Sequence, residues 1–312
     1  MSLEYLPVVL ESIKSDAFPP VAVFLRQGSR YILYKDREVD LTRSALVSLR
    51  ESRVSHVFVR AADCDALHSY FEEHLESIFL GDSVSLAGKN LVLCSTMVNY
   101  ISEAYQSPHL ATPFHNCRRL LKRFQLCVAD RQELLTLLEC AAQSGVYLFT
   151  HCAQMAILAM AMYQKLFNAS HGEQVEVGLG AMLHDIGMLN VSHNIVSKCD
   201  ALDSSEYYRV KEHVRDGYRI AQERGITETT ALDIILRHHE RFDGRGYPGS
   251  LSHYEIPRSA QVAGICDVFS ALTNDRPYRE ASTITEALET MRSEAKLFNP
   301  QFFSFFEEMV SN

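Results

Sequence analysis

The sequence predicts an α+β protein in which a small N-terminal α/β module and a helical linker precede an all-α helical bundle. Three observations lead to this prediction. Short runs with strand-like alternation are confined to about the first 80 residues. From about Ser83 onward, apolar residues recur at three- and four-residue steps, as they do in amphipathic helices. The chain has 312 residues, which is longer than one core usually fills, so two domains are expected.

The predicted N-terminal module covers residues 1–82 and is interpreted as regulatory, although nothing in it indicates which signal it reads. Turn residues separate its strand-like runs, and helices should fill the rest. The expected strands are Val21–Arg26, Tyr31–Tyr34 and Ser55–Arg60. One helix, capped by Asp40 or Thr42, should run to Arg50, and a second should begin at Asp63 and end at Phe79.

Residues 83–144 are predicted to form a helical linker whose length is compatible with a homodimer interface. Its expected helices are Leu91–Glu103 and Arg118–Ala142. Residues 145–312 are predicted to be an all-α bundle, which can direct side chains from several helices into one central site. Its most apolar stretch, Val146–Phe167, contains polar residues such as His151 and is therefore expected as a buried helix and not as a membrane span.

Composition and charge restrict the classes of function. The formal net charge of −9 argues against general nucleic-acid binding, because phosphate backbones attract clusters of Lys and Arg. A small anionic ligand in a local basic pocket is still compatible with this charge. The eight cysteines include no CxxC pair, and Met1–Ser12 lacks the apolar core of a signal peptide. We therefore expect reduced thiols and a cytoplasmic protein that does not enter a membrane.

Seven polar residues of the C-terminal half are expected on inward helix faces, where unpaired polar or charged groups are unfavourable. Apolar residues at helical spacing place His213 on a buried face, and a stripe of alanines does the same for Asp267. A single histidine on such a face is more often a satisfied core residue, but the joint pattern has no simple structural explanation. The predicted metal ligands are His151, His184, Asp185, His213, His238, His239 and Asp267.

The chemistry of this ligand set predicts a binuclear metal site. Imidazole and carboxylate groups without thiolate suit iron, manganese, zinc or nickel, and seven side chains exceed what one ion needs. Two divalent ions about 3.5–4 Å apart activate a water and neutralise both the attacking and the leaving oxygen in phosphoryl chemistry. We found no GxSxG, P-loop or paired Cys–His signature that would indicate a competing nucleophile. The residues therefore predict hydrolysis of a phosphodiester.

At these positions the chain resembles the HD-GYP family of cyclic di-GMP phosphodiesterases, a branch of the HD-domain phosphohydrolase superfamily. The resemblance covers roughly residues 145–308. An HD pair followed in order by HHE and DGxGYP is highly specific, whereas an HD pair alone is a weak signal. The matching segments are MLHDIG at 182–187, HHER at 238–241, DGRGYP at 243–248, AGICDVFSAL at 263–272 and RPYR at 276–279.

The resemblance implies a bacterial signalling hydrolase and gives each matching residue a role. A hydroxide between two metal ions, most simply iron or alternatively manganese, would attack cyclic di-GMP and give linear pGpG and, on further cleavage, GMP. His184 and Asp185 would form the catalytic pair. The first ion would be held by His151, His184, Asp185 and Asp267, and the second, bridged by Asp185, by His213, His238 and His239.

The resemblance also implies contacts with substrate and partners. Arg276 and Arg279 would grip the substrate phosphate, a geometry that suits guanidinium, although a surface role at a helix end is an alternative. Tyr247 would shape the pocket. The GYP loop would line the site or meet a partner protein, and its alternative role is a turn that braces the site. This loop includes Asp243, Gly244, Gly246, Tyr247 and Pro248.

Three departures from the family pattern refine these expectations. Members with a third metal ion carry a glutamate where this chain has Tyr147, so two ions are predicted. The usual HDIGK ends in Met188, which removes a lysine that the family directs at the phosphate. The usual His-Pro is His213-Val214, which should alter only the local backbone. Binding and turnover of cyclic di-GMP are therefore expected to be weakened.

Two alternatives to this enzyme follow from the same residues. The metal site could serve a phosphodiesterase for another cyclic dinucleotide. It could also serve a signalling scaffold that senses a cyclic dinucleotide with low turnover. The loss of the lysine at Met188 favours the scaffold, whereas the intact ligand set and the intact GYP loop favour the enzyme.

Overall fold

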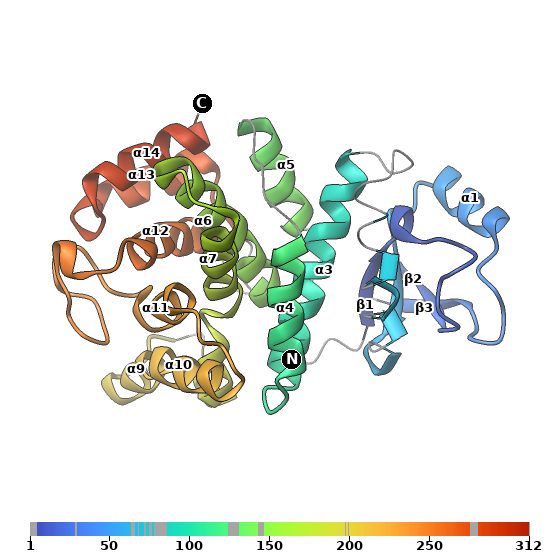
Figure 1. The fold of residues 1–312 in the computed structure, drawn as a ribbon, viewed down its shortest axis with the longest axis horizontal. Helices are drawn as coiled ribbons and strands as arrows, with labels where there is room; N and C mark the ends of the chain where they lie inside the picture. Colours follow the sequence, from blue (N-terminus) through green and yellow to red (C-terminus); the bar gives the residue numbers. More distant parts are fainter. Residues whose placement is uncertain are drawn as a thin grey trace.

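The chain is described by a computed structural model over residues 5–28, 30–63, 66–67, 69–71, 73–74, 77, 86–123, 131–142, 147–196, 198, 200–274 and 280–311. A small sheet lies at one end of the molecule, and helices build the rest (Figure 1). The predicted α+β fold class is confirmed. The helix expected from Asp63 to Phe79 falls partly outside the described residues, and its described positions from 66 to 77 are helical.

The sheet consists of four antiparallel strands in the order β1-β4-β2-β3. Valines of the strands fill its core, with Val8, Val23 and Val59 fully buried. Three strands agree with the predicted ones, and β1 was not predicted. The bounds are Tyr5–Val9 for β1, Val23–Gln27 for β2, Arg30–Lys35 for β3 and His56–Arg60 for β4.

Helix α1, Arg43–Glu51, begins at the predicted cap, because the Thr42 hydroxyl accepts a hydrogen bond from the Ala45 amide at 3.2 Å. Short 3₁₀ turns follow β1 and β4 at Leu10–Ser12 and Ala61–Asp63.

Helix α3, Leu86–Gln106, connects the sheet with the helical half (Figure 1). Next to the sheet, the Asn99 amide donates to the Pro7 carbonyl of β1 at 3.2 Å. Along its length, α3 packs against α4 (Thr112–Arg123), α5 (Arg131–Ala142) and α6 (Tyr147–Phe167). The predicted helix 118–142 differs from this arrangement, because α4 begins at Thr112. Residues 124–130 lie outside the described part of the chain.

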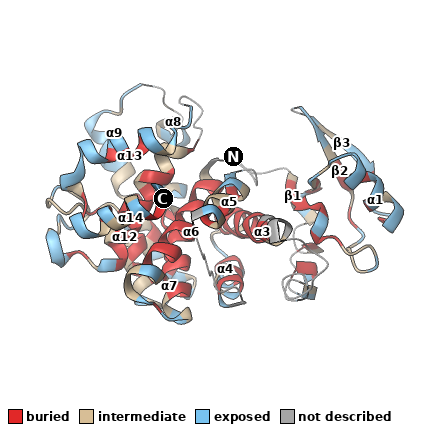
Figure 2. Cartoon of the chain, turned by 90° about the horizontal axis from the view of Figure 1, so that it is seen from above, coloured by how far each residue is buried: buried red, intermediate tan, exposed pale blue. Residues whose placement is uncertain are grey.

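The helical half is packed around α6, whose residues from Phe149 to Tyr163 are buried, as expected for its apolar sequence (Figure 2). Within the described ranges, no helix combines the length and the hydropathy needed to cross a membrane. The remaining helices are α7 His171–Leu183, α8 His193–Val196, α9 Ser204–Lys211, α10 His213–Glu223, α11 Thr229–Arg237, α12 Arg258–Thr273, α13 Ile284–Ser293 and α14 Pro300–Ser311, with 3₁₀ turns at Ile186–Asn190 (η3), His253–Glu255 (η4) and Ala295–Leu297 (η5).

Candidate metal centre

The seven predicted ligands converge in the helical half, but most of them lie at helix ends and not on helix faces as expected. His184 caps the end of α7, and His238 caps the end of α11. His213 is the first residue of α10. Only His151 in α6 and Asp267 in α12 lie within helices. Helix ends bring backbone groups close to these side chains, and this decides how the imidazole rings are oriented.

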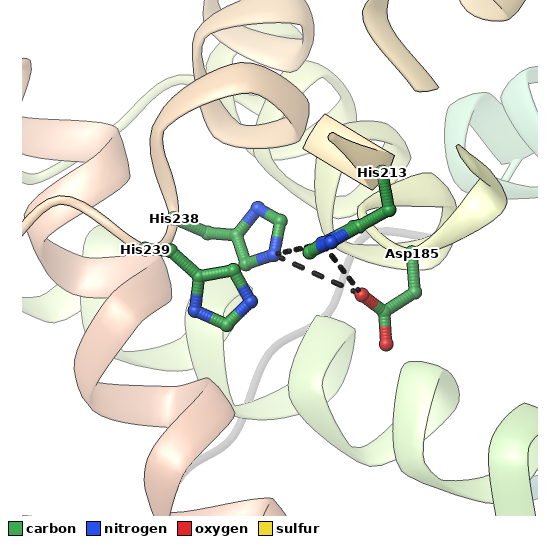
Figure 3. A group of neighbouring side chains, drawn as sticks. All are labelled: Asp185, His213, His238 and His239. Atoms are coloured by element: carbon green, nitrogen blue, oxygen red, sulfur yellow. Dashed lines mark hydrogen bonds and ion pairs between the residues drawn. The ribbon is translucent and has the colours of Figure 1, made fainter. Parts of the chain in front are cut away.

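One group of four predicted ligands, drawn in Figure 3, consists of Asp185 and three histidines that lie near one oxygen of its carboxylate. The Asp185 Oδ1 atom lies 3.2 Å from His213 Nε2 and 3.8 Å from His238 Nε2. The two imidazole nitrogens are themselves 3.4 Å apart. His239 completes the group, and all four ligand atoms lie within 4.8 Å of one another. These three nitrogens and one oxygen lie close enough together to hold one metal ion.

A second group uses the other oxygen of the same carboxylate. Asp185 Oδ2 lies 3.3 Å from His184 Nε2, and His151 joins them as the third member. Asp267 lies beside this group, with Oδ1 at 3.2 Å from His151 Nε2 and at 3.9 Å from His184 Nε2. Its Oδ2 is 3.9 Å from His239 Nδ1 in the first group. Asp185 therefore belongs to both groups, and Asp267 reaches toward both.

Hydrogen bonds at Nδ1 orient four of the five imidazole rings. His184 Nδ1 lies 2.8 Å from the Ala181 carbonyl, and His213 Nδ1 lies 2.6 Å from the Val210 carbonyl. These carbonyls are one turn earlier in the chain, where a side chain can use them. A donor hydrogen on Nδ1 leaves Nε2 with a free lone pair directed at the centre. The other two contacts are from His238 Nδ1 to the Ile234 carbonyl and from His151 Nδ1 to Ser270 Oγ, each at 3.0 Å.

The electrostatics favour ionised carboxylates among neutral imidazoles. Burial opposes ionisation of Asp267, but the hydrogen bond from His151 and the nearby His239 hold its pKa well below the usual range. Burial likewise opposes ionisation of Asp185, and His184 outweighs it, so the pKa of Asp185 is also held well below the usual range. Burial lowers the pKa of His239 to about 3 and lowers the pKa of His238 well below its usual value.

His184 behaves differently. Burial acts to lower the pKa of its imidazole, but the Asp185 carboxylate outweighs burial and raises that pKa well above the usual range. The ring is fully buried, and its Nε2 atom has no hydrogen-bond partner of good geometry among the described residues. A positive charge is therefore favoured at this place, and a cation that binds there must displace the proton of His184.

The donor set fits divalent metal ions. Two clusters of imidazole nitrogens and carboxylate oxygens share Asp185, and one buried nitrogen, His184 Nε2, makes no hydrogen bond of good geometry among the described residues. Nitrogen and oxygen donors without thiolate suit transition metals such as iron, manganese and zinc. The side chains of Asp185 and His239 are 20% and 22% exposed, so the centre is open to solvent along one edge.

Glycine allows the backbone of the HD segment to approach α10. A Cβ atom at Gly187 would lie 1.9 Å from the His213 carbonyl oxygen and 2.5 Å from the Gly217 amide nitrogen, distances that no side chain permits. Because Gly187 follows Asp185 by two residues, this close contact sets Asp185 against the helix that begins with His213. The sequence His-Asp-Ile-Gly thus joins both ligand groups through backbone packing.

The GYP loop folds back on the end of α11. The Glu240 carboxylate accepts hydrogen bonds from the Gly249 amide at 2.6 Å and from the Leu251 amide at 3.0 Å. Tyr247 stacks on the proposed ligand His239, with ring centres 4.7 Å apart. A Cβ at Gly246 would lie 2.5 Å or less from backbone atoms of residues 239–241. The loop therefore forms one wall of the centre, while Asp243 and Gly244 lie in the turn that precedes Gly246.

Some predicted site residues are not reached by the structure. Arg276 and Arg279 lie outside the described residues, and α12 ends at Thr273 just before them. Tyr147 is the first residue of α6, but its side chain is not among those described. Met188 lies in the η3 turn and is partly buried. The prediction of two ions and the role of both arginines therefore stay predictions.

A polar network that supports His151 was not predicted from the sequence. Ser270 Oγ, which contacts His151 Nδ1, also lies 3.4 Å from Gln154 Oε1. The Asn274 amide donates to the Ser270 carbonyl at 2.7 Å and to Gln154 Oε1. Ser270 follows Asp267 by three residues and Gln154 follows His151 by three, so both share the face of a predicted ligand. That spacing was the available signal.

Comparisons with known proteins agree with this geometry. The model of the HD domain family matches residues 128–302, more than half of the chain. The cyclic di-GMP phosphodiesterase PA4108 of Pseudomonas aeruginosa is 33% identical over 167 residues, which cover 54% of this chain and 40% of that protein. The 3'3'-cGAMP-specific phosphodiesterase 1 of Vibrio cholerae is 32% identical over 148 residues, which cover 47% of this chain and 34% of that protein.

The fold as a whole is similar to a solved structure, that of Bd1817, a HDG"Y"P protein from Bdellovibrio bacteriovorus. The TM-score is 0.70 with 16% sequence identity, and the match covers 99% of this chain and 100% of that one. At this identity the likeness concerns the fold alone. The chain spans less than half the length of the two curated relatives. The family-model match, over residues 128–302, lies in the helical half.

Proposed function

The chain belongs to the HD domain family, and from that premise we propose that it is a metal-dependent phosphodiesterase that hydrolyses cyclic di-GMP to linear pGpG and then GMP. The observation that carries the proposal is the pair of ligand groups that share Asp185. Two adjacent cation positions joined by one carboxylate are an arrangement that suits the cleavage of phosphodiesters. The names of the matched relatives, both phosphodiesterases of cyclic dinucleotides, support the choice of substrate class.

Two divalent ions, iron or alternatively manganese, are the proposed cofactors, since imidazole and carboxylate donors suit both metals. Asp185, which belongs to both ligand groups, would contribute to holding each ion. The first ion is assigned to His151, His184, Asp185 and Asp267, and the second to Asp185, His213, His238 and His239. The distances among these side chains support the assignment, and so does His184 Nε2, which makes no hydrogen bond of good geometry among the described residues.

The two ions, when bound, supply charge neutralisation at the phosphate and lower the pKa of water that attacks it. The protein side chains prepare the site for this chemistry. Asp185 and Asp267 stay ionised at neutral pH, because their pKa values are held low. Tyr247 stays a neutral hydrogen-bond donor, because burial raises the pKa of its hydroxyl well above the usual range. Its ring, stacked on His239, excludes water from one side.

The activity test uses protein loaded anaerobically with iron or with manganese and assayed against cyclic di-GMP. The expected result is formation of pGpG, loss of that activity in the His184→Ala variant, and two metal ions per chain by elemental analysis. Assaying 3'3'-cGAMP in parallel decides between the proposed substrate and the other cyclic dinucleotide, to which one relative's name points. Tight binding of cyclic di-GMP without turnover would instead establish the scaffold alternative.

The division of the chain is part of the proposal. Residues 1–82 form a regulatory module, residues 83–144 a helical linker suited to homodimer formation, and residues 145–312 the phosphohydrolase domain. The sheet at residues 5–60 supports the first boundary, and the family match over residues 128–302 covers most of the last unit but begins within the proposed linker. Arg276 and Arg279 are proposed to contact the substrate, and the GYP loop is proposed to contact a partner protein as well as the site.

A further inference from the structure

A cyclic dinucleotide carries two phosphates, and a centre with two ions holds only the one that is being cleaved. The other phosphate needs a cation from the protein, since anions bind best where a charged donor meets them. The HDIG segment is followed by the uncharged Met188, which does not provide this cation. Arg241 is near the centre, but its guanidinium donates to the carbonyls of His238 at 2.9 Å and Glu240 at 3.1 Å.

Lys211 also lies beside this wall of the site. It is the last residue of α9 and precedes the proposed ligand His213 by two residues. Its ammonium lies 5.2 Å from the ring centre of Tyr247 and 4.6 Å from that of Tyr207. Because Tyr247 stacks on His239, only one aromatic ring separates Lys211 from the metal centre. The lysine is thus held against the wall that Tyr247 forms.

No carboxylate neutralises Lys211 within the part of the chain that the structure describes. The acids of its own helix and cap are engaged elsewhere: Glu206 binds Lys198 at 2.5 Å, and Glu212 lies 3.8 Å from Arg215. Aromatic faces hold an ammonium group without cancelling its charge. The two rings therefore hold the Lys211 ammonium in place, and its charge can still bind an anion.

We propose that Lys211 binds the phosphate of the cyclic dinucleotide that is not being cleaved, while Tyr207 and Tyr247 hold its side chain in place. This inference rests on the proposed function, because it assumes a substrate with two phosphates. A contact with the phosphate that does not react is equally strong before and during cleavage. Its loss should therefore raise KM and leave kcat unchanged.

The test compares two substrates in three variants. Lys211→Met removes the charge and keeps an apolar stem against the tyrosines, Lys211→Arg keeps the charge, and Lys198→Met is a matched control that removes a lysine already paired with Glu206. Cyclic di-GMP has two phosphates and bis(p-nitrophenyl) phosphate has one. For Lys211→Met we expect KM for cyclic di-GMP to rise roughly tenfold or more, with little change for the single-phosphate substrate. Lys211→Arg and Lys198→Met should stay close to wild type.

The remaining outcomes are equally decisive. An unchanged KM for cyclic di-GMP in Lys211→Met would overturn the inference, and so would an equal loss with both substrates, which would indicate a structural role. Calorimetric binding of cyclic di-GMP to protein stripped of metal gives a readout independent of turnover, and Lys211→Met should weaken that binding as well. A wild-type protein that cleaves bis(p-nitrophenyl) phosphate but neither binds nor cleaves cyclic di-GMP contradicts the proposed function itself, and the inference fails with it.

Discussion

The sheet end and the helical end of the molecule have cores of different chemistry. Among the described residues before position 83, the buried side chains are apolar except for Ser12 and Lys35, and the Lys35 ammonium donates to the Val21 carbonyl at 3.1 Å. The helical end instead buries a cluster of imidazole, carboxylate, amide and hydroxyl groups around one point. Its buried polar residues there include His151, Gln154, His184, His213, His238, Asp267, Ser270 and Asn274.

This difference shows which end of the molecule is built for stability and which for chemistry. Buried polar groups are unfavourable unless they are paired, and replacing them by apolar side chains often stabilises a protein. The helical end keeps them, and backbone carbonyls fix the imidazole rings so that their Nε2 atoms face one another. Such a polar core is explained by a bound cation, whereas the sheet core is explained by packing alone.

The largest expected effect comes from the carboxylate that both ligand groups share. Asp185→Asn should abolish binding of both ions and lower activity by on the order of a thousandfold or more, because each ion loses its bridging ligand. Elemental analysis and the cyclic di-GMP assay measure the two effects. Asp216→Asn is the matched control, since Asp216 is an acid of α10 that pairs with Arg219 near the surface. Retention of two ions in the Asp185→Asn protein would remove Asp185 from the centre.

A substitution in the core of the sheet should lower the free energy of unfolding without changing metal binding or catalysis. Leu6→Ala in β1 removes a buried side chain, and we expect a loss of about 2–5 kcal/mol in the free energy of unfolding. Metal content and kcat should be unchanged at temperatures where the protein is folded. Ile32→Ala in β3 is the control, because Ile32 is 48% exposed and its loss should change stability by less than about 0.5 kcal/mol. A drop in metal content with Leu6→Ala would show that the two cores are coupled.

A smaller effect is expected from the side chain that orients His151. Ser270→Ala removes the contact to His151 Nδ1 at 3.0 Å, and loss of such a supporting group typically weakens metal binding by roughly ten- to hundredfold. Only the ion assigned to His151 and His184 should be affected, so metal titration should resolve one weakened site. Thr273→Ala provides the control, because the Thr273 hydroxyl bonds to the Phe269 carbonyl of its own helix. Equal affinities in both variants would exclude a role for Ser270.

The strands illustrate how far local sequence predicts the fold. Alternation identified β4, because valines at every second position are buried there. The same rule missed β1, whose segment YLPVV does not alternate and contains Pro7. Because β1 lies at the edge of the sheet, Pro7 disrupts fewer ladder bonds there than it would in a central strand. Helix α4 likewise begins before Pro113, since proline fits the first turn of a helix and need not end one.

The sequence predicted which residues gather at the site but not how they are arranged in space. The ligand residues could be recognised because several inward polar residues have no structural explanation. Their arrangement could not be, because it depends on contacts between segments far apart in the sequence. Gly187 against the His213 carbonyl and Ser270 against His151 are two such contacts. Lys211 was missed for the same reason, since a lysine at a helix end is ordinary until the ring of Tyr247 is placed beside it.

The last prediction concerns how the free energy of unfolding depends on pH, where the effect expected for each pH unit is the smallest of the four. Burial lowers the pKa of His239 to about 3, so between about pH 6.5 and pH 3 the unfolded chain binds a proton that the folded chain does not. Stability of the protein without metal should therefore fall as the pH is lowered through this window, with a contribution from His239 approaching roughly 1.4 kcal/mol per pH unit. Denaturant unfolding of chelator-treated protein at a series of pH values measures this slope.

His239→Gln should make that slope shallower, because the glutamine does not titrate. His56→Gln in β4 is the comparison from the sheet, since burial also lowers the pKa of His56 but no metal ligand surrounds it. Adding metal should distinguish the effects of the two histidine substitutions. A bound ion stabilises the folded state and competes with the proton at His239, so it should steepen the acid-dependent loss of stability in wild type and in His56→Gln. In His239→Gln the ion should have a smaller effect, and an equal effect in all three proteins would contradict the assignment of His239 as a ligand.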